Sequence, residues 1–256
     1  MPPTRSEIGQ RGRIKGRELL MHFRTQAIEE IDVVAMAAEY DLDIRDGGLT
    51  GAEGRLTRGA KGGIIRIRAD ISEPRRRRFI VAHELGHFFL HPNTSALCAE
   101  KDLVKYDAGD GEAEANAFAA EVLMPRPLFE PFCNPARPSL HVVKRLADDF
   151  TTTLTATAIR FVDLTEEACA VVWSEAGRVK WSIPGRNFYP WVPFGRTLNT
   201  LSHAGDFFAG EPLPDNPCEV PGGAWVDGGG DLWEHSVYFQ SLSAVFTLLW
   251  RPARGD

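Results

Sequence analysis

The 256-residue sequence is 43% hydrophobic and 25% charged, with a formal net charge of −6. This composition is ordinary for a globular protein of one large or two modest domains, and the acidic balance argues against a dedicated duplex-DNA-binding protein. No apolar run is long enough to span a membrane, and the basic N-terminus lacks the apolar segment of a secretory signal. We therefore expect a cytoplasmic protein whose four cysteines are reduced.

The first part of the chain predicts a helical segment followed by short strands. Residues 1–16 are polar and are expected to be flexible, whereas residues 17–40 have helix-forming composition and apolar residues at three- and four-residue spacing. A short strand is expected at 42–45. Residues 62–69 alternate in polarity and predict a second strand with one buried face. The edge of that strand could pair with an extended substrate segment.

Two helices are predicted on either side of a loop. The first runs from about residue 73 to residue 90, with Ser72 as its cap and Pro74 in its first turn. The second covers about 111–123 and ends before Pro125. Its many alanines would let another helix approach closely.

The remaining sequence predicts a helix pair and then a β-rich region. Residues 139–165 read as two helices joined by a tight turn, in a helix-turn-helix-like arrangement. From about residue 166 the pattern changes to strands, with a hairpin around Glu175 to Gly177 and another strand segment near the end.

The first of the two central helices carries an HExxH motif, from His83 to His87. Residues four apart lie on one face of an α-helix, so the two imidazoles can bind one zinc ion. Glu84 would project beside the metal, where it can take a proton from water that zinc has made acidic. The alternative is a helix with two ordinary histidines, and the apolar residues on both sides of the motif favour the metal.

A catalytic zinc site needs a third protein ligand and keeps one position open. The next helix offers three glutamates. Glu112 shares a face with Asn116, four residues on, so Glu112 could bind zinc while Asn116 hydrogen-bonds a ligand histidine. Glu114 lies on another face and is the second choice, whereas Glu121 is expected at the surface.

Two blocks of the sequence, RRRFIVAHELGHFFLH and EAEANAFAAEVLMP, resemble the ImmA/IrrE family of metallopeptidases. The resemblance covers about residues 20–165. It implies a zincin-like, gluzincin-type core with one zinc per chain, bound by His83, His87 and Glu112, with Glu84 as general base. It also implies that the substrate is a helix-turn-helix transcriptional repressor, cleaved to switch on a DNA-damage, stress, mobile-element or phage-defence response.

Two residues near the motif have more than one interpretation. Cys98 lies between the second histidine and Glu112, and its thiolate could occupy the fourth position on zinc and keep the enzyme latent. The alternative is an ordinary half-buried thiol. His91 follows His87 by four residues but has rotated away from the metal, so we expect it at the helix end or beside a ligand.

Peptide cleavage also needs a group that stabilises the oxyanion. Tyr106, His141 and Arg160 are candidates, and the sequence does not choose among them.

Basic and aromatic residues suggest a nucleic-acid contact in the β-rich part. Arg178, Lys180, Trp181 and Arg186 could bind single-stranded DNA, because cations interleaved with aromatic rings bind unpaired bases. The alternative is core packing of the aromatic residues. The run of arginines at 75–78 is expected to be a solvated face, with phosphate binding as the alternative.

We therefore predict an α+β chain with a zinc metallopeptidase domain at 17–138, a helical extension at 139–165 and a mixed, β-rich sensor-like domain at 166–256, for which a GAF-like fold is one candidate. The predicted function is cleavage of a repressor, with single-stranded DNA as the suggested activator. One competing function is a non-catalytic, zinc-containing anti-repressor. The other is a transcription factor that binds DNA through residues 139–164, although the second helix of that pair has one arginine and an aspartate and would read bases poorly. The oligomeric state is not predicted.

Overall fold

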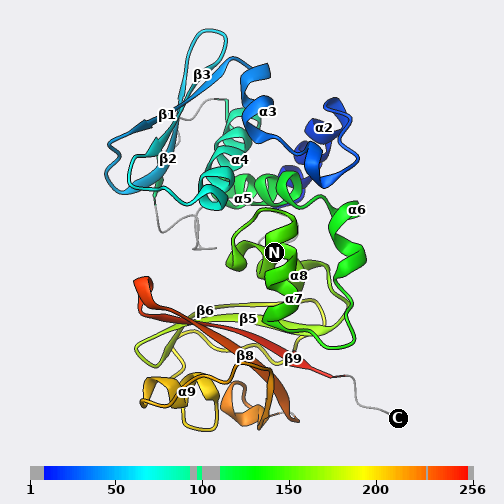
Figure 1. Cartoon of the computed structure of the whole chain (residues 1–256), viewed down its shortest axis with the longest axis vertical. Coiled ribbons are helices and arrows are strands. Elements are labelled where there is room, and N and C mark those ends of the chain that lie inside the picture. The colour runs from blue at the N-terminus through cyan, green and yellow to red at the C-terminus, as the bar shows by residue number, and fades with distance from the viewer. Residues whose placement is uncertain (1–8, 93–96, 100–109, 229, 253–256) are drawn as a thin grey trace. The chain divides into compact units, whose positions relative to one another are not determined.

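The computed structural model describes residues 9–92, 97–99, 110–228 and 230–252 (Figure 1). The chain folds into two compact units. The N-terminal unit comprises Met1–Leu128 and Asp149–Thr153, and the C-terminal unit comprises Phe129–Asp148 and Leu154–Asp256. Both units combine helices with a sheet, as the predicted α+β class requires. No helix in the described ranges has the length and apolar character needed to cross a membrane.

The N-terminal unit packs helices on a small sheet. Its elements are α2 (Gln10–His22), η1 (Ile28–Glu30), α3 (Val33–Glu39), β1 (Leu42–Gly47), β2 (Ala52–Arg58), β3 (Gly63–Arg68), α4 (Pro74–Leu90), β4 (Leu97–Ala99) and α5 (Asp110–Leu123). The described strands form a sheet in the order β1-β3-β2-β4, in which β1 is parallel to β3 and the other pairs are antiparallel. Helix α4 packs on β2 and β3 and on α5.

The prediction of a flexible N-terminus was wrong for residues 10–16, which belong to α2. Gly12 and Gly16 explain the error. Glycines in a polar segment are typical of a flexible chain, but here they allow α2 to pack closely on α5. A Cβ on Gly12 would lie 2.0 Å from the carbonyl oxygen of Glu114, and one on Gly16 would lie 3.1 Å from Cβ of Glu121. The helix predicted for 17–40 is also interrupted, since α2 ends at His22.

The prediction that the strand at 62–69 could pair along its edge with an extended substrate segment was wrong as well. Strand β3 lies between β1 and β2 and pairs with both. Ile65 and Ile67 are fully buried, which accounts for the alternating pattern. The outer position next to β2 belongs to β4, a strand that the sequence pattern did not predict.

Helix α4 is capped by Glu73 and not by the predicted Ser72. The Glu73 carboxylate accepts hydrogen bonds from the backbone amides of Arg75 and Arg76, at 3.1 and 2.6 Å. A carboxylate also suits the positive end of the helix dipole, next to a run of arginines.

The arginines of this first turn bind within the unit. Arg76 forms a bidentate pair with the buried Glu53, and Arg77 pairs with Asp46 at 2.7 Å. Arg78 donates to the backbone carbonyls of Phe150 and Ile31. The run therefore ties α4 to the sheet and to neighbouring loops, so neither the solvated face nor phosphate binding describes it.

The C-terminal unit is built on an antiparallel sheet. Its elements are α7 (Leu140–Asp149), α8 (Leu154–Leu164), β5 (Ala168–Glu175), β6 (Arg178–Pro184), α9 (His203–Phe208), β7 (Cys218–Val220), η3 (Gly222–Ala224), β8 (Leu232–Phe239), η4 (Gln240–Leu242) and β9 (Ala244–Arg251), and the short α6 (Arg126–Phe129) and η2 (Glu130–Phe132) lead into it. The strand order is β6-β5-β9-β8-β7. The hairpin predicted around Glu175 to Gly177 joins β5 and β6, and the last strand segment became the hairpin β8–β9.

A buried glutamate organises one side of this sheet. Glu234 on β8 accepts hydrogen bonds from the amide of Ala204, the indole of Trp225 and the hydroxyl of Ser236, at 2.7, 2.8 and 3.0 Å. Burial raises the pKa of the Glu234 carboxyl, although these hydrogen bonds oppose the change. The network anchors α9 and the segment around Trp225 to the sheet, where an apolar core surrounds them.

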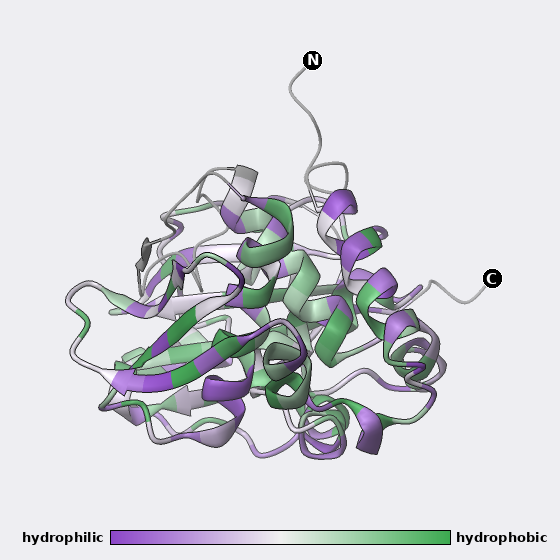
Figure 2. Ribbon diagram, turned by 90° about the horizontal axis from the view of Figure 1, so that it is seen from above, coloured by the Kyte–Doolittle hydropathy of each residue, from purple (hydrophilic) through white to green (hydrophobic). Residues whose placement is uncertain are grey.

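Hydrophobic and hydrophilic residues alternate along the helices and strands (Figure 2).

Candidate metal centre

Helices α4 and α5 bring the three predicted zinc ligands together. His83 and His87 lie one turn apart on the buried face of α4, and Glu112 faces them from the first turn of α5. Nε2 of His83 lies 3.2 Å from Oε2 of Glu112, Nε2 of His87 lies 3.2 Å from Oε1 of Glu112, and the two Nε2 atoms are 3.0 Å apart. The donor atoms therefore converge on one point.

The packing of α4 on α5 depends on the absence of a side chain at Gly86. A Cβ there would lie 3.0 Å from Cα of Ala115 and 3.2 Å from its carbonyl oxygen. The glycine inside the motif thus makes room for α5, and the alanine of α5 faces it. This close contact places Glu112 within reach of both histidines.

These separations fit a tetrahedral zinc ion. Nitrogen and oxygen ligands bound at about 2.0–2.2 Å to a tetrahedral ion are separated by roughly 3.3–3.6 Å, a few tenths of an ångström more than the distances found here. Burial raises the pKa of the Glu112 carboxyl, but hydrogen bonds from His83 and His87 and their charges outweigh it, so the pKa lies well below its ordinary value. The carboxylate is therefore held in the ionised form that binds metal.

A hydrogen bond orients the first histidine. Nδ1 of His83 lies 3.0 Å from Oδ1 of Asn116, one helical turn after Glu112, as the four-residue spacing predicted. With Oδ1 as acceptor, Nδ1 is the donor, so Nε2 would be the nitrogen without a proton when His83 binds a metal. Such a partner fixes both the tautomer and the direction of a ligand imidazole.

A longer chain of contacts orients the second histidine. Nδ1 of His87 lies 2.9 Å from Nδ1 of His91, and Nε2 of His91 lies 2.9 Å from Oε2 of Glu114. Arg11 on α2 contacts the same carboxylate oxygen at 3.3 Å. His91 thus lies beside a ligand, as its spacing suggested, and Glu114, the second choice as ligand, contacts His91 instead.

Two residues that support the fold around the site differ from the sequence predictions: Arg58 was not predicted to contribute, and Glu121 was predicted at the surface. Arg58 on β2 donates to the carbonyl oxygens of His87 and Phe88 at 2.8 Å and of His91 at 3.2 Å, which fixes the C-terminal end of α4. Glu121 was expected at the surface but is fully buried, where it contacts Arg17 at 3.1 Å. No local pattern identifies either contact, because both partners are distant in sequence.

Glu84 lies against a strand that carries no side chain at the point of contact. The glutamate is fully buried. A Cβ on Gly54 of β2 would lie 2.5 Å from Oε1 of Glu84 and 2.6 Å from Cγ2 of Ile80. Only glycine leaves space for the Glu84 carboxylate beside the histidines, so β2 belongs to the site as much as α4 does.

Strand β4 runs antiparallel to β2 beside this position. In the register of the two strands, Cys98 is opposite Gly54. The side chain of Cys98 lies outside the described residues, so its predicted role as a fourth ligand stays a prediction.

The residues expected to contact nucleic acid lie on β6 and in the loop after it. Arg178, Lys180 and Arg186 are exposed, whereas Trp181 is half-buried and stacks on Trp173 with ring centroids 5.8 Å apart. Phe194 lies in this loop and is not among the residues predicted from the sequence to contact nucleic acid. It is 82% exposed, and Tyr189 and Trp191 are 76% and 66% exposed.

The oxyanion candidates are not brought to the metal ligands by any described contact. Arg160 is 3% exposed and pairs with Asp163 at 3.4 Å within α8. His141 packs against His235 with ring centroids 4.6 Å apart. Tyr106 lies outside the described residues.

The comparisons with known proteins agree with the geometry. The model of the IrrE N-terminal-like domain, a peptidase family, matches residues 37–162, which contain the HExxH motif and Glu112. A solved structure, a Mycobacterium tuberculosis transcriptional regulator, resembles the chain with a TM-score of 0.60 at 13% identity, over 97% of this chain and 81% of that chain. At this identity the likeness concerns the fold alone. A search of curated proteins gives no match. Residues 37–162 therefore form a domain of the IrrE N-terminal-like, or ImmA/IrrE, family.

Proposed function

We propose that the chain is a zinc metalloendopeptidase. The observation that carries the proposal is the convergence of His83, His87 and Glu112 on one point beside the buried Glu84. Two imidazoles and one carboxylate are the ligand set of catalytic zinc sites that leave a fourth position open. A purely structural zinc site would be closed by a fourth ligand and would not need an adjacent acid.

The residues divide the chemistry between them. Zinc, when bound, supplies a Lewis acid for the scissile carbonyl and makes a water acidic at neutral pH. Glu84 accepts the proton of the attacking water and delivers it to the leaving amine, a transfer that typically contributes about 10²–10⁴-fold. Asn116 and His91 hold the ligand imidazoles in position.

The substrate in this proposal is a helix-turn-helix repressor. The support is the family membership of residues 37–162. Because β3 is central, an extended segment of substrate would pair at the outer side of β2, the position that β4 holds here. Cleavage would relieve repression of a DNA-damage, stress, mobile-element or phage-defence response.

The C-terminal unit is proposed as the sensor. Its β-rich architecture supports this assignment, and a GAF-like fold and a cytoplasmic location remain part of the proposal. The proposed activator is single-stranded DNA, which would contact Arg178, Lys180, Arg186 and the exposed aromatic rings of the following loop. Trp181 is a weaker contact because it stacks on Trp173.

The geometry counts against direct DNA reading by residues 139–164. In α8, the second helix of the pair, Thr157, Ala158, Phe161 and Val162 are fully buried, and the only arginine, Arg160, is buried as well. A recognition helix must offer exposed polar side chains to base edges. The non-catalytic anti-repressor remains the competing function.

Replacing Glu84 with glutamine separates the two functions. The variant should bind zinc as the wild type does but cleave a purified helix-turn-helix repressor at least roughly 100-fold more slowly, since the proton carrier is lost. Glu39→Gln, on an exposed acid of α3, is the matched control and should cleave normally. If Glu84→Gln releases the repressor from its operator as fast as the wild type, the anti-repressor function is correct and catalysis is not.

A further inference from the structure

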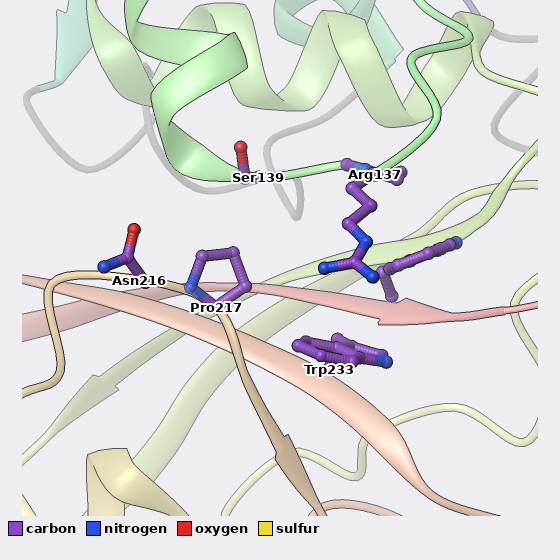
Figure 3. Close-up of a pocket in the computed structure, with 7 residues that line it drawn as sticks. Arg137, Ser139, Asn216, Pro217 and Trp233 are labelled. Carbon is purple, nitrogen blue, oxygen red and sulfur yellow. The ribbon is translucent and has the colours of Figure 1, made fainter.

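The C-terminal unit contains a cavity of about 350 Å³ to which the proposed proteolysis gives no role (Figure 3). Its walls are formed by Arg137, Pro138, Ser139, Asn216, Pro217, Trp233 and Trp250, all residues of this unit. The volume lies at the lower end of the range for small-molecule sites, about 300–1,000 Å³. A compact ligand would therefore fill it.

Planar groups dominate the cavity. The guanidinium of Arg137 lies over the ring of Trp233, with Cζ 5.4 Å from the ring centroid. The ring of Trp250 lies 6.3 Å from that of Trp233 at an angle of 37°. The indole N–H of Trp250 donates to Glu167 at 2.9 Å, so this ring is held in place before any ligand arrives. Figure 3 shows the extended Arg137 side chain reaching over Trp233.

The charge at the cavity is available to a ligand. Arg137 is exposed, and no acidic side chain in the described part of the chain pairs with it. Two carboxylates lie nearby, because Glu167 accepts the hydrogen bond of the Trp250 indole and Glu219 is opposite Trp233 in the register of β7 and β8, on the same face of the sheet. A ligand with one phosphate group fits this balance better than a polyphosphate.

The chemistry of the lining selects the class of ligand. A guanidinium beside indole rings repels cationic ligands and offers no advantage to an aliphatic chain, but it stacks on planar heterocycles and pairs with phosphate. The amide of Asn216 and the hydroxyl of Ser139 add groups that can bond the polar edge of a base. Tryptophan faces supply the stacking surface.

We infer that this cavity binds a nucleoside monophosphate unit, with its base stacked at Trp233 and Trp250 and its phosphate on Arg137. The unit can be a free mononucleotide or one nucleotide of a single strand. Both sources present the same planar base and one phosphate group, so one site can accept either.

The test is a calorimetric titration of the intact wild-type protein with adenosine 5′-monophosphate, ribose 5-phosphate and a deoxyadenosine hexamer. The monophosphate should bind, and ribose 5-phosphate should bind roughly tenfold to a hundredfold more weakly because it has no base to stack. Arg137→Ala should weaken the monophosphate at least roughly tenfold. Arg145→Ala, on an exposed arginine of α7, is the matched control and should leave binding unchanged.

Trp233→Phe and Trp233→Leu add a test of stacking. The phenylalanine variant should retain most of the affinity and the leucine variant should lose it, with circular dichroism confirming that both fold. A hexamer that competes with the monophosphate and binds more tightly identifies a strand as the source, whereas a weaker hexamer identifies the free nucleotide. Absence of monophosphate binding at millimolar concentration would overturn the inference. Equal affinity for ribose 5-phosphate, or unchanged binding by Arg137→Ala, would overturn it as well.

Discussion

Adding a single methyl group at Gly54 should abolish cleavage while leaving the metal site intact. The new Cβ would lie 2.5 Å from Oε1 of Glu84 and 2.6 Å from Cγ2 of Ile80, whereas ordinary contacts begin near 3.4 Å. Roughly 1 Å of movement is therefore needed. Both neighbours are buried, but Oε1 is the far end of the longer Glu84 side chain whereas Cγ2 is bonded to Cβ of Ile80, so Glu84 is the neighbour that can move. A displacement of about 1 Å at a catalytic group costs about 100-fold in rate, and the overpacking should destabilise the fold by about 1–3 kcal/mol.

Three measurements on Gly54→Ala test this reasoning. Zinc content per chain should match the wild type, the midpoint of thermal unfolding should fall, and cleavage of a purified helix-turn-helix repressor should be roughly 100-fold slower. Gly59→Ala is the matched control in the adjoining turn, since its Cβ would have no neighbour closer than 3.7 Å. If Gly54→Ala cleaves as fast as Gly59→Ala, then Glu84 does not act from the position that the structure shows.

Three further predictions concern single side chains. Asn116→Ala removes the partner of His83 and should weaken zinc affinity about 10–100-fold, measured by competition with a chelator, and unchanged affinity would exclude the orienting role. Cys98→Ala should raise cleavage in the absence of any trigger, and an unchanged resting rate would disprove a thiolate latch. His235 has a pKa lowered to about 4 by burial and by His141. The unfolded chain therefore binds more protons than the folded protein between about pH 6.5 and 4, so the contribution of His235 to stability is complete above pH 6.5 and falls as the pH approaches 4. His235→Asn should reduce the loss of unfolding free energy over that range by roughly 2–3 kcal/mol, measured by urea denaturation, and identical pH profiles would contradict the pKa.

The arrangement of the metal ligands was predictable because it follows from helical periodicity. Positions 83 and 87 must share a face of any helix that contains them, and positions 112 and 116 likewise. The sequence also marked the ends of α4 and α5 well, since prolines follow both helices. The contact between the two helices was not predictable from the sequence. It depends on the close approach of Gly86 on α4 to Ala115 on α5.

The misplaced features depend on partners far away in the chain. From the sequence alone, Gly12 and Gly16 predict a flexible segment, but in the structure they pack against α5. Glu121 is likewise predicted at the surface, but in the structure it is buried and contacts Arg17. Strand β2 has a weak pattern of its own, and its place in the sheet follows from pairing with β3 and β4. Gly54, which makes room for Glu84, lies on that strand. This part of the site therefore could not be predicted from local sequence patterns.

X-ray absorption at the zinc edge of the purified protein tests the metal centre most directly. We predict about one zinc per chain with two imidazole nitrogens at about 2.0–2.1 Å and carboxylate oxygen in the same shell, and one sulfur near 2.3 Å only if Cys98 is bound. His83→Ala should lose the metal. A protein purified without stoichiometric zinc, or a spectrum without imidazole scattering, would contradict the proposed centre.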